Sequence, residues 1–402
     1  MRSLRIIMAM VEPPLPFGSA AARVYYGMLK ALVERGHRVS AFATCSNPVE
    51  IAIAQEMFPA SRYRLRCYSH PERRGVRAKW DTLRQPFSFM FSTEMRADLY
   101  RELQSGYDVL HLEQLMSGWL GLENTDRSLV SVHFLSAIDL DNYRPASVRE
   151  RVQRLLLLKT ERRILREYKY FRALSSRLVD PIRKINSSAD ITSVPIGMDL
   201  SPYPFIPDQR RSSDPVVSLI GSMGWHPTHT AAVRLLTRLY PEIKRREPDT
   251  RFQIVGWSAR SVLQQYIGLP DVEIFENVPD TRPFFENASV LLYAPSRASG
   301  VKIKVAEAMA FGVPVVTTTD GVEGLAARDG IDVNIVDDDA GLVDRTVRLL
   351  RSRKLQDRQR RAAREMLETA CTPRVAVQGL EKIYGRMIGL PQLELAEARR
   401  IV

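Results

Sequence analysis

The residues best suited to chemistry lie close together at positions 296–319, in the segment SRASGVKIKVAEAMAFGVPVVTTT. Gly300 stands in the expected loop, where a residue without a side chain lets the backbone approach a ligand closely. Lys302 and Lys304 follow at the expected start of a helix, where unpaired N–H groups already favour an anion. Glu307, further along that helix, offers a carboxylate to hydroxyl groups. The segment therefore predicts a pocket for a ligand that carries both phosphate and hydroxyl groups.

Packing alone explains part of the same pattern. A strand–helix–strand crossover often needs glycine in its turn, alanine on its helix and valine in its second strand. Charge favours a site, because Arg297, two lysines and one acid stand within a few residues of the glycine. Both interpretations remain open for this segment taken alone.

The first half of the chain has the pattern of a parallel α/β domain. Residues 4–11 (LRIIMAMV) predict a buried strand, an amphipathic helix ends at Gly36, and HRVSAFAT predicts a second strand. This order is the βαβ unit of a parallel sheet. The connecting loop contains Gly18 and Ser19, where a phosphate or sugar can approach, but no G-x-G-x-x-G fingerprint. Further strands are predicted at 108–114, 128–134 and 171–176.

A second α/β run begins after a polar segment with four prolines, Ser201–Pro215, which predicts an interdomain linker. Its predicted strands are VVSLIGSM, RFQIVG, VEIFENV, SVLLYAP and VPVVTTT, with a helix at about 228–246. The expected fold class is therefore α/β, with two Rossmann-like parallel-sheet domains that face a cleft. Because ligands of such sheets bind outside the carboxyl ends of strands, residues after strand ends are site candidates: Gly18, Ser19, His133, Gly221, Ser222, Met223, Gly256 and the loop 297–304.

Composition limits the possible partners. The net charge of +12 suits anionic partners, but no stripe of exposed aromatic residues interleaves with the bases, so nucleic acid is not expected. Three scattered cysteines suggest no metal site, and no D-x-D motif stands out where a metal-dependent reaction would need it. Residues 4–11 run directly into Glu12 and two prolines, which favours a strand over a signal peptide. The few, scattered cysteines favour a cytoplasmic location.

A basic helix is predicted from about Ala146 to Tyr170, within a basic region at 144–172. It either packs its apolar positions, Val148, Val152 and Leu155 among them, on the core with a solvated basic side, or attaches to an anionic membrane surface. A second basic segment stands at 73–79, and the residues after 390 resemble a loose tail.

The second half resembles the nucleotide-sugar-binding half of retaining GT-B glycosyltransferases of family 4. The resemblance is carried by GSMGWHP (221–227), FQIVG (252–256), the long segment 277–318 and DGVEGL (320–325). It is greatest to the subgroup with GSM-x-W-x-P and a G-x-K-x-K loop before EAMA. The first half also fits, since VPIGMDL (194–200) is similar to the family's VPNGVD segment.

The resemblance implies an enzyme that moves a sugar from a nucleotide-diphosphate sugar to an acceptor hydroxyl, with retention of configuration and without a metal cofactor. The implied acceptor is a glycan, a glycolipid or a small-molecule glycoside. The implied boundaries are 1–200 for an acceptor-binding domain, 201–215 for a linker, 216–374 for the nucleotide-sugar-binding domain, and 375–402 for a helix that returns to the first domain and a tail.

The chain departs from the family at two places. Glu307 matches the second acid of the family's E-x7-E pair, expected on the ribose, but Ser299 occupies the position of the first acid. After Gly221 the family has an Arg and a Lys that hold the diphosphate, whereas this chain has Ser222 and Met223. The expected replacements for that charge are Lys302 and Lys304, with Arg297. The subgroup usually shows both departures.

The site residues are carried over position by position. Catalytic roles are implied for His133, Lys304 and Glu307, although a strand-end histidine such as His133 can also be simply packed. Donor contacts are implied for Gly18, Ser19, Gly221, Ser222, Met223, Gly256, Val278, Arg297, Ser299, Gly300, Val301, Lys302 and Ile303. Acceptor contacts are implied for Phe17, Arg23 and Asp139. The alternatives are a GT-B nucleotide-sugar epimerase, or a nucleotide-sugar-binding protein without turnover because Ser299 replaces the acid.

Overall fold

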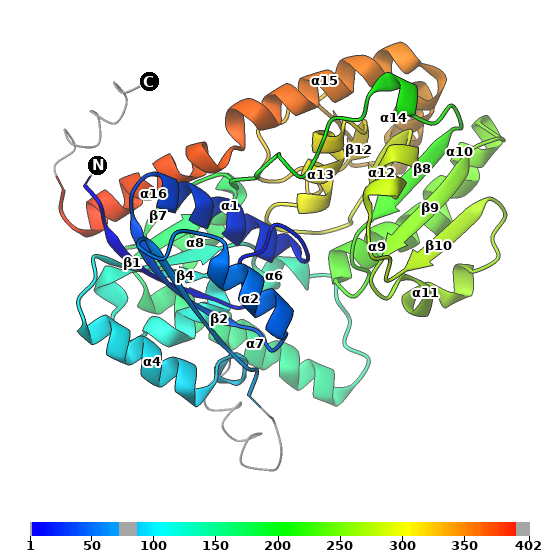
Figure 1. Ribbon diagram of the computed structural model, residues 1–402. Helices are drawn as coiled ribbons and strands as arrows, with labels where there is room; N and C mark the ends of the chain where they lie inside the picture. Colours follow the sequence, from blue (N-terminus) through cyan, green and yellow to red (C-terminus); the bar gives the residue numbers. More distant parts are fainter. Residues whose placement is uncertain (1, 72–86, 391–402) are drawn as a thin grey trace. The chain divides into compact units, whose positions relative to one another are not determined.

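The computed structural model describes residues 2–71 and 87–390 (Figure 1). The basic segment 73–79 and the tail 391–402 lie outside the described residues. The chain divides into two compact units, which are described separately below. The first comprises Met1–Ser136, Arg144–Asp199 and Thr372–Val402, and the second comprises Ala137–Tyr143 and Leu200–Cys371.

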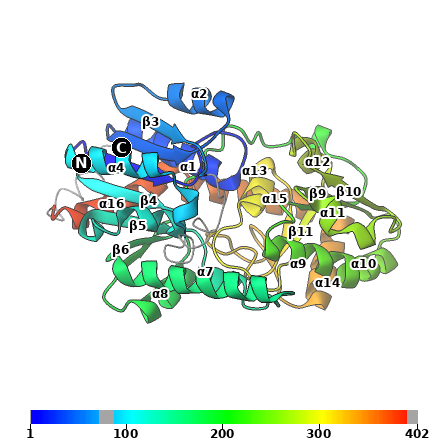
Figure 2. The same cartoon turned by 90° about the horizontal axis from the view of Figure 1, so that it is seen from below.

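The described part of the first unit contains a seven-stranded parallel sheet with the order β3-β2-β1-β4-β5-β6-β7. Figure 2 shows β3 on one side of this sheet and β4, β5 and β6 in that order toward the other. All residues of β4, β5 and β6 are buried, as expected of parallel strands that are covered on both faces. The strands are β1 (Arg5–Met10), β2 (Arg38–Thr44), β3 (Tyr63–Tyr68), β4 (Val109–Glu113), β5 (Ser128–Val132), β6 (Tyr170–Ala173) and β7 (Asp190–Ser193).

Helices connect these strands in the first unit, and the last described helix of the chain joins them. They are α1 (Ala20–Glu34), α2 (Pro48–Glu56), α4 (Thr93–Gln104), α5 (Gln114–Ser117), α7 (Val148–Glu167), α8 (Val179–Ile185) and α16 (Pro373–Met387). The short α6 (Ser136–Asp139) lies where the chain passes from the first unit to the second.

The edge strand β3 is an element that the sequence analysis missed. Its sequence, YRLRCY, alternates apolar residues with arginines, because an edge strand keeps one side in solvent. Arg64 is exposed, and Arg66 forms an ion pair of 3.1 Å with Glu102 of α4. This alternation predicts a strand, but it extends over only six residues.

The basic helix α7 forms close to its expected bounds, with Ser147 as the N-cap residue whose Oγ accepts from the Glu150 N–H at 3.2 Å. Its expected packing is wrong in the first half. Val148, Val152 and Leu155 are 76%, 45% and 63% exposed, and the fully buried residues begin only at Thr160. The physical reason is that only the last turns of α7 pack against the unit.

The described part of the second unit contains a six-stranded parallel sheet with the order β10-β9-β8-β11-β12-β13. The strands are β8 (Val216–Ile220), β9 (Arg251–Gly256), β10 (Val272–Glu276), β11 (Val290–Tyr293), β12 (Val315–Thr317) and β13 (Asn334–Ile335). The helices are α9 (His226–Arg234), α10 (Tyr240–Arg246), α11 (Ala259–Val262), α12 (Arg282–Asn287), α13 (Ile303–Phe311), α14 (Asp339–Arg351) and α15 (Arg353–Ala370).

The helix expected at about 228–246 is interrupted by a π-helical turn at Leu235–Leu239, between α9 and α10. Pro241 is the second residue of α10, and a proline inside a helix removes one N–H donor and crowds the preceding turn. The wider turn accommodates it. Helix α13 ends as expected, because Gly312 takes the left-handed conformation, with φ of +79°, that terminates a helix.

The last described helix, α16, packs on α1 within the first unit. Glu381 accepts two hydrogen bonds from the Arg35 guanidinium, at 2.7 and 2.6 Å, and contacts buried His37 at 3.0 Å. Burial raises the pKa of Glu381, but the hydrogen bonds from His37 and Arg35 outweigh it and lower the pKa below its usual value. The carboxylate is therefore ionised at neutral pH.

We predict that Glu381→Ala lowers the free energy of unfolding by about 3 kcal/mol, because it leaves His37 and Arg35 without their carboxylate. Arg386→Ala on the same helix is the matched control, since its partly exposed pair with Asp190 is worth at most about 1 kcal/mol. Urea denaturation of both variants measures the difference, and equal losses would contradict the prediction.

The penalty of Glu381→Ala also depends on pH. A carboxylate whose pKa is lowered by folding stabilises the protein above its unfolded pKa and loses that contribution as the pH falls through its folded pKa. The stability difference between wild type and Glu381→Ala should therefore shrink in acid.

Candidate functional site

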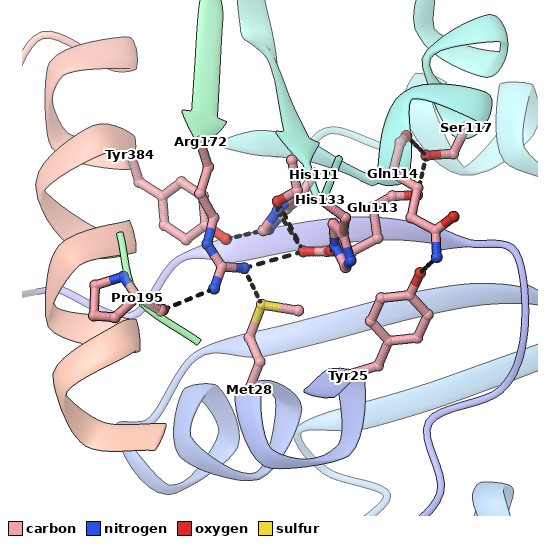
Figure 3. Close-up of polar contacts among 11 residues, drawn as sticks. Tyr25, Met28, His111, Glu113, Gln114, Ser117, His133, Arg172, Pro195 and Tyr384 are labelled. Atoms are coloured by element: carbon pink, nitrogen blue, oxygen red, sulfur yellow. Dashed lines mark hydrogen bonds and ion pairs between the residues drawn. The ribbon is translucent and has the colours of Figure 1, made fainter. Parts of the chain in front are cut away.

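A cluster of buried polar side chains lies at the carboxyl ends of β4 and β5 in the first unit (Figure 3). Glu113 ends β4 and is completely buried, and His133 follows β5 and is 12% exposed at its side chain. The Glu113 Oε2 atom lies 2.6 Å from His133 Nε2. The predicted site residue His133 is therefore held by a carboxylate that the sequence analysis did not single out.

The other carboxylate oxygen of Glu113 is surrounded by donors. Oε1 lies 2.9 Å from His111 Nε2, 3.0 Å from Ser131 Oγ and 3.4 Å from Arg172 Nη1. Arg172 is itself completely buried and also donates to the Pro195 carbonyl oxygen at 3.2 Å. This pairing satisfies the general requirement that a buried charge has a partner of opposite sign and hydrogen bonds.

The cluster keeps Glu113 ionised. Burial alone raises the pKa of Glu113, but its electrostatic interactions and hydrogen bonds with the rings of His111 and His133 outweigh it and hold the pKa well below its usual range. Burial lowers the pKa of His111, which favours the neutral ring. Burial also raises the pKa of Tyr384 well above its usual value, so its hydroxyl keeps its proton and lies 2.6 Å from His111 Nδ1.

The predicted loop residues of the first unit follow β1. Gly18 has a φ of +83°, which glycine adopts without strain, and the Ser19 Oγ caps α1 by accepting from the Ala22 N–H at 3.1 Å. Phe17 is 45% exposed, and Arg23 is partly buried in the first turn of α1. Burial raises the pKa of nearby Glu12, and this effect exceeds the opposing hydrogen bond with Ser19 and the charge of His133.

In the second unit, two glycines allow β8 and β9 to end against each other. A Cβ atom on Gly256 would lie 1.9 Å from the carbonyl oxygen of Gly221. A Cβ atom on Gly221, whose φ is +151°, would lie 2.3 Å from Lys304 Cε. Both positions therefore need glycine, and the Lys304 side chain runs directly against the backbone at the carboxyl end of β8.

The Lys304 ammonium contacts a hydroxyl group and two aromatic rings. Its Nζ donates to Thr228 Oγ1 at 2.8 Å and lies 4.9 and 4.6 Å from the ring centroids of Trp225 and Tyr293. Burial, together with the charge of Lys302, lowers the pKa of Lys304 to about 7. An anion beside Nζ would stabilise the protonated form.

The loop before α13 is held by side chains on both sides. The Ser299 N–H and Oγ–H both donate to Asp139 Oδ1 at 2.6 Å, and the Gly300 N–H donates to Glu323 Oε1 at 3.0 Å. Gly300 has a φ of +71°. Lys302 is 1% exposed, and its Nζ donates to the carbonyl oxygens of Ser299, at 2.7 Å, and Gly300. The Lys302 ammonium thus shapes the loop, and Asp139, expected near an acceptor, binds Ser299.

Glu307 lies one turn after Lys304 on α13 and is 7% exposed. Its Oε1 accepts a hydrogen bond from the Tyr203 hydroxyl at 3.2 Å. The alanines beside it let α13 pack closely on the sheet, as the sequence indicated. A buried carboxylate in this position can accept hydrogen bonds from a ligand that enters beside Lys304.

The remaining predicted donor residues have varied surroundings. Arg297 is about half exposed and lies 3.9 Å from Asp141 Oδ2, and Ser222 is exposed. Met223 is 1% exposed, so its side chain is part of the core. Val278 and Val301 are partly buried, and Ile303 is the first residue of α13.

Sequence reasoning missed four polar residues: Glu113, Arg172, Thr228 and Glu323. A signal existed for Glu113, since an acid directly follows the apolar strand VLHL, and for Arg172, since an arginine interrupts an apolar strand. Thr228 and Glu323 become visible only through their contacts with Lys304 and Gly300.

Two further features concern metals and membranes. Residues 2–71 and 87–390 contain no group of three or more His, Cys, Asp or Glu side chains that is arranged to hold a metal ion. In the same ranges, no helix has both the length and the apolar character needed to cross a membrane.

Comparison with protein families matches a domain to each unit. Residues 19–197 match the glycosyl transferase 4-like domain, and residues 214–352 match glycosyl transferases group 1. No curated protein matched the sequence.

Solved structures match nearly the whole chain. Sucrose-phosphate synthase from Thermosynechococcus elongatus has a TM-score of 0.68 at 17% identity, over 96% of this chain and 100% of that one. Anabaena HepE in complex with UDP-glucose has a TM-score of 0.66 at 12% identity, over 96% and 100%. S. aureus TarM, in complex with UDP, Fondaparinux and alpha-GlcNAc-glycerol, has a TM-score of 0.66 at 11% identity, over 95% and 99%.

At these low identities the structural neighbours show the fold, and they confirm the two-domain α/β architecture expected from the sequence. The family matches add the activity, because both matched domains are glycosyltransferase domains. A glycosyltransferase domain in each parallel-sheet unit, together with these neighbours, identifies the chain as a glycosyltransferase of the GT-B fold.

Proposed function

We propose that this glycosyltransferase moves a sugar from a nucleotide-diphosphate sugar to an acceptor hydroxyl, with retention of configuration. The donor binds at the carboxyl edge of the sheet in the second unit, and the acceptor binds mainly to the first. The observation that carries the proposal is the Lys304 ammonium, which lies against the Gly221 backbone at that edge and donates its hydrogen bond to the uncharged Thr228 hydroxyl.

The proposed task of Lys304 is to stabilise the departing diphosphate. Negative charge develops on the phosphate oxygens as the bond to the sugar breaks, and a cation fixed in place stabilises that charge most. The N-terminus of α13 adds unpaired N–H groups beside it. Lys302 supports this arrangement indirectly, since its contacts with two carbonyl oxygens fix the loop that leads into the helix.

Glu307 is proposed to accept hydrogen bonds from the ribose hydroxyls of the donor, and Tyr203 holds its carboxylate in place. A uridine nucleotide is the first donor class to test, because the HepE and TarM structures contain UDP-glucose and UDP respectively. Saccharides in the TarM complex suggest testing a glycan, a glycolipid or a small-molecule glycoside as the acceptor. We propose that the transfer needs no metal ion.

A donor screen tests the proposal as a whole. The purified protein is incubated with UDP-, GDP- and ADP-sugars, with and without glycoside acceptors, and the products are separated. Transfer to an acceptor is expected. An isomerised nucleotide sugar without acceptor would indicate an epimerase, and binding without any turnover would indicate a protein that only holds the nucleotide sugar.

We also propose that α7 attaches the enzyme to an anionic membrane surface, in which case it works at the inner membrane face. At 100° per residue, the exposed Val148, Val152 and Leu155 lie on one face of the helix. The exposed bases Arg162 and Arg166 continue the same face toward the C-terminus. Apolar side chains that enter a bilayer beside bases that meet anionic headgroups are typical of interfacial helices.

Lys304→Met should lower kcat by about 10²–10³-fold, the usual loss when one electrostatic contact to a developing charge is removed. The matched control is Arg297→Met, which removes an exposed base from the same segment and should cost far less. Steady-state kinetics with the identified donor checks both, and a larger loss in Arg297→Met would contradict the role of Lys304.

The wild-type kcat/KM for the donor should fall as the pH rises above about 7, because the free enzyme then loses the proton of Lys304. The kcat/KM falls because the protonated ammonium is the form that stabilises the diphosphate, and this form is depleted above the pKa of Lys304. A pH profile that is flat between 6 and 9 would show that the Lys304 charge is not needed.

Glu307→Gln should weaken binding of UDP and reduce the preference for UDP over 2′-deoxy-UDP and 3′-deoxy-UDP, because the amide is a weaker acceptor for the ribose hydroxyls. Titration calorimetry with the three nucleotides measures this preference. Glu323→Gln is the control, since Glu323 contacts the loop backbone. If Glu307→Gln prefers UDP over its deoxy analogues as strongly as the wild type does, Glu307 does not contact the ribose.

Sedimentation with vesicles tests the surface of α7. Vesicles with anionic lipid should bind the wild type better than neutral vesicles, and both Val152→Ser/Leu155→Ser and Arg162→Ser/Arg166→Ser should bind less. Arg358→Ser/Arg361→Ser on α15 removes the same charge from another exposed helix face and should bind normally. Equal binding to both vesicle types would end the electrostatic version of the proposal.

A further inference from the structure

We infer that Glu113 is a positioning residue that fixes the tautomer of His133, so that His133 presents an unprotonated Nδ1 to a substrate hydroxyl. This assignment rests on the proposed function only in taking the hydroxyl to belong to the sugar donor or the acceptor.

The tautomer follows from the pairing of the two side chains. Glu113 Oε2 lies 2.6 Å from His133 Nε2, and the carboxylate is ionised because its pKa is held well below the usual range. An ionised carboxylate can only accept hydrogen bonds. The proton of a neutral His133 ring must therefore be on Nε2, and Nδ1 keeps its lone pair.

A chain of donors keeps Glu113 in this orientation. Tyr384 donates from α16 to His111 Nδ1 at 2.6 Å, so His111 carries its proton on Nε2, 2.9 Å from Glu113 Oε1. Arg172 and Ser131 donate to the same oxygen, at 3.4 and 3.0 Å. The contacts of His111, Ser131 and Arg172 all reach Oε1 (Figure 3), and they leave Oε2 for His133.

The other side of the His133 ring is open to a ligand. Among residues 2–71 and 87–390, no side chain or backbone group forms a hydrogen bond with its Nδ1. The side chain is 12% exposed, and the ring of Tyr25 meets its ring edge-on at a centroid distance of 5.9 Å. A partner of Nδ1 must be a donor, and a sugar hydroxyl is the donor that both substrates of a glycosyltransferase carry.

The chemistry makes a specific demand on that substrate. The hydroxyl that meets His133 must point its hydrogen toward the ring, and an analogue with hydrogen or fluorine in place of that hydroxyl loses the interaction. A site whose acceptor is left unpaired by such an analogue discriminates strongly against it.

Nitrogen NMR of the histidine rings tests the inference without turnover. The protein has six histidines, so the signals of His133 are assigned with a His133→Gln variant. At a pH where the ring is neutral, the wild type should show a protonated Nε2 and an unprotonated Nδ1. Glu113→Gln should lose this preference, because an amide can also donate to Nε2.

Glu113→Gln leaves the buried Arg172 without its carboxylate and can unfold for that reason. The paired variant Glu113→Gln/Arg172→Met removes both charges and keeps the test valid, with circular dichroism as the check of folding. Its tautomer preference should be lost in the same way, and kcat should fall at least tenfold for a substrate that keeps the hydroxyl.

Either of two results would overturn the inference: a wild-type His133 protonated on Nδ1, or an unchanged Nε2 proton in the folded paired variant. Ser131→Ala, which keeps the carboxylate and its bond to His133, should retain the wild-type tautomer. Failure of the donor screen would remove the proposed function but would leave the tautomer measurement in force, so the two failures are distinguishable.

Discussion

A lysine ammonium pressed against a glycine backbone is the constraint on which the second unit depends. Lys304 reaches the carboxyl edge of the sheet only because Gly221 has no side chain there. It is partly buried beside a hydroxyl and two aromatic rings, and burial makes its charge costly, so its pKa falls to about 7. An anionic ligand at this edge would relieve that cost.

The first unit contains a buried charge of the opposite sign. There the buried carboxylate of Glu113 already has several donors, and a buried arginine balances its charge. The inferred tautomer of His133 leaves the lone pair of its Nδ1 available, at the point where β5 ends. The second unit thus contains a cation, Lys304, whose hydrogen bond goes to an uncharged hydroxyl, and the first contains an oriented hydrogen-bond acceptor, His133. Charge stabilisation and hydroxyl recognition are the two tasks that sugar transfer from a nucleotide diphosphate requires.

Much of this arrangement could be predicted from the sequence because it is local. Apolar runs predicted most of the strands, and Gly312 predicted the end of α13. The G-x-K-x-K motif predicted both lysines at the start of a helix, where they lie, but spacing could not distinguish their roles. Lys302 turns back to the loop carbonyl oxygens, whereas Lys304 reaches Thr228, which is 76 residues away in sequence. Likewise, Val148 and Leu155 have the spacing of a packed helix face, but whether anything covers that face depends on tertiary structure. The pairing of Glu113 with Arg172 needs two neighbouring strands in register.

The most direct measurement is the proton uptake that accompanies UDP binding. Titration calorimetry at pH 8, in buffers of different ionisation enthalpy, reports it. Because the pKa of Lys304 is about 7 in the free protein, most molecules should be deprotonated at Lys304 and should take up close to one proton on binding. The uptake should disappear in Lys304→Met. UDP binding without proton uptake by the wild type would contradict the claim that Lys304 meets the diphosphate.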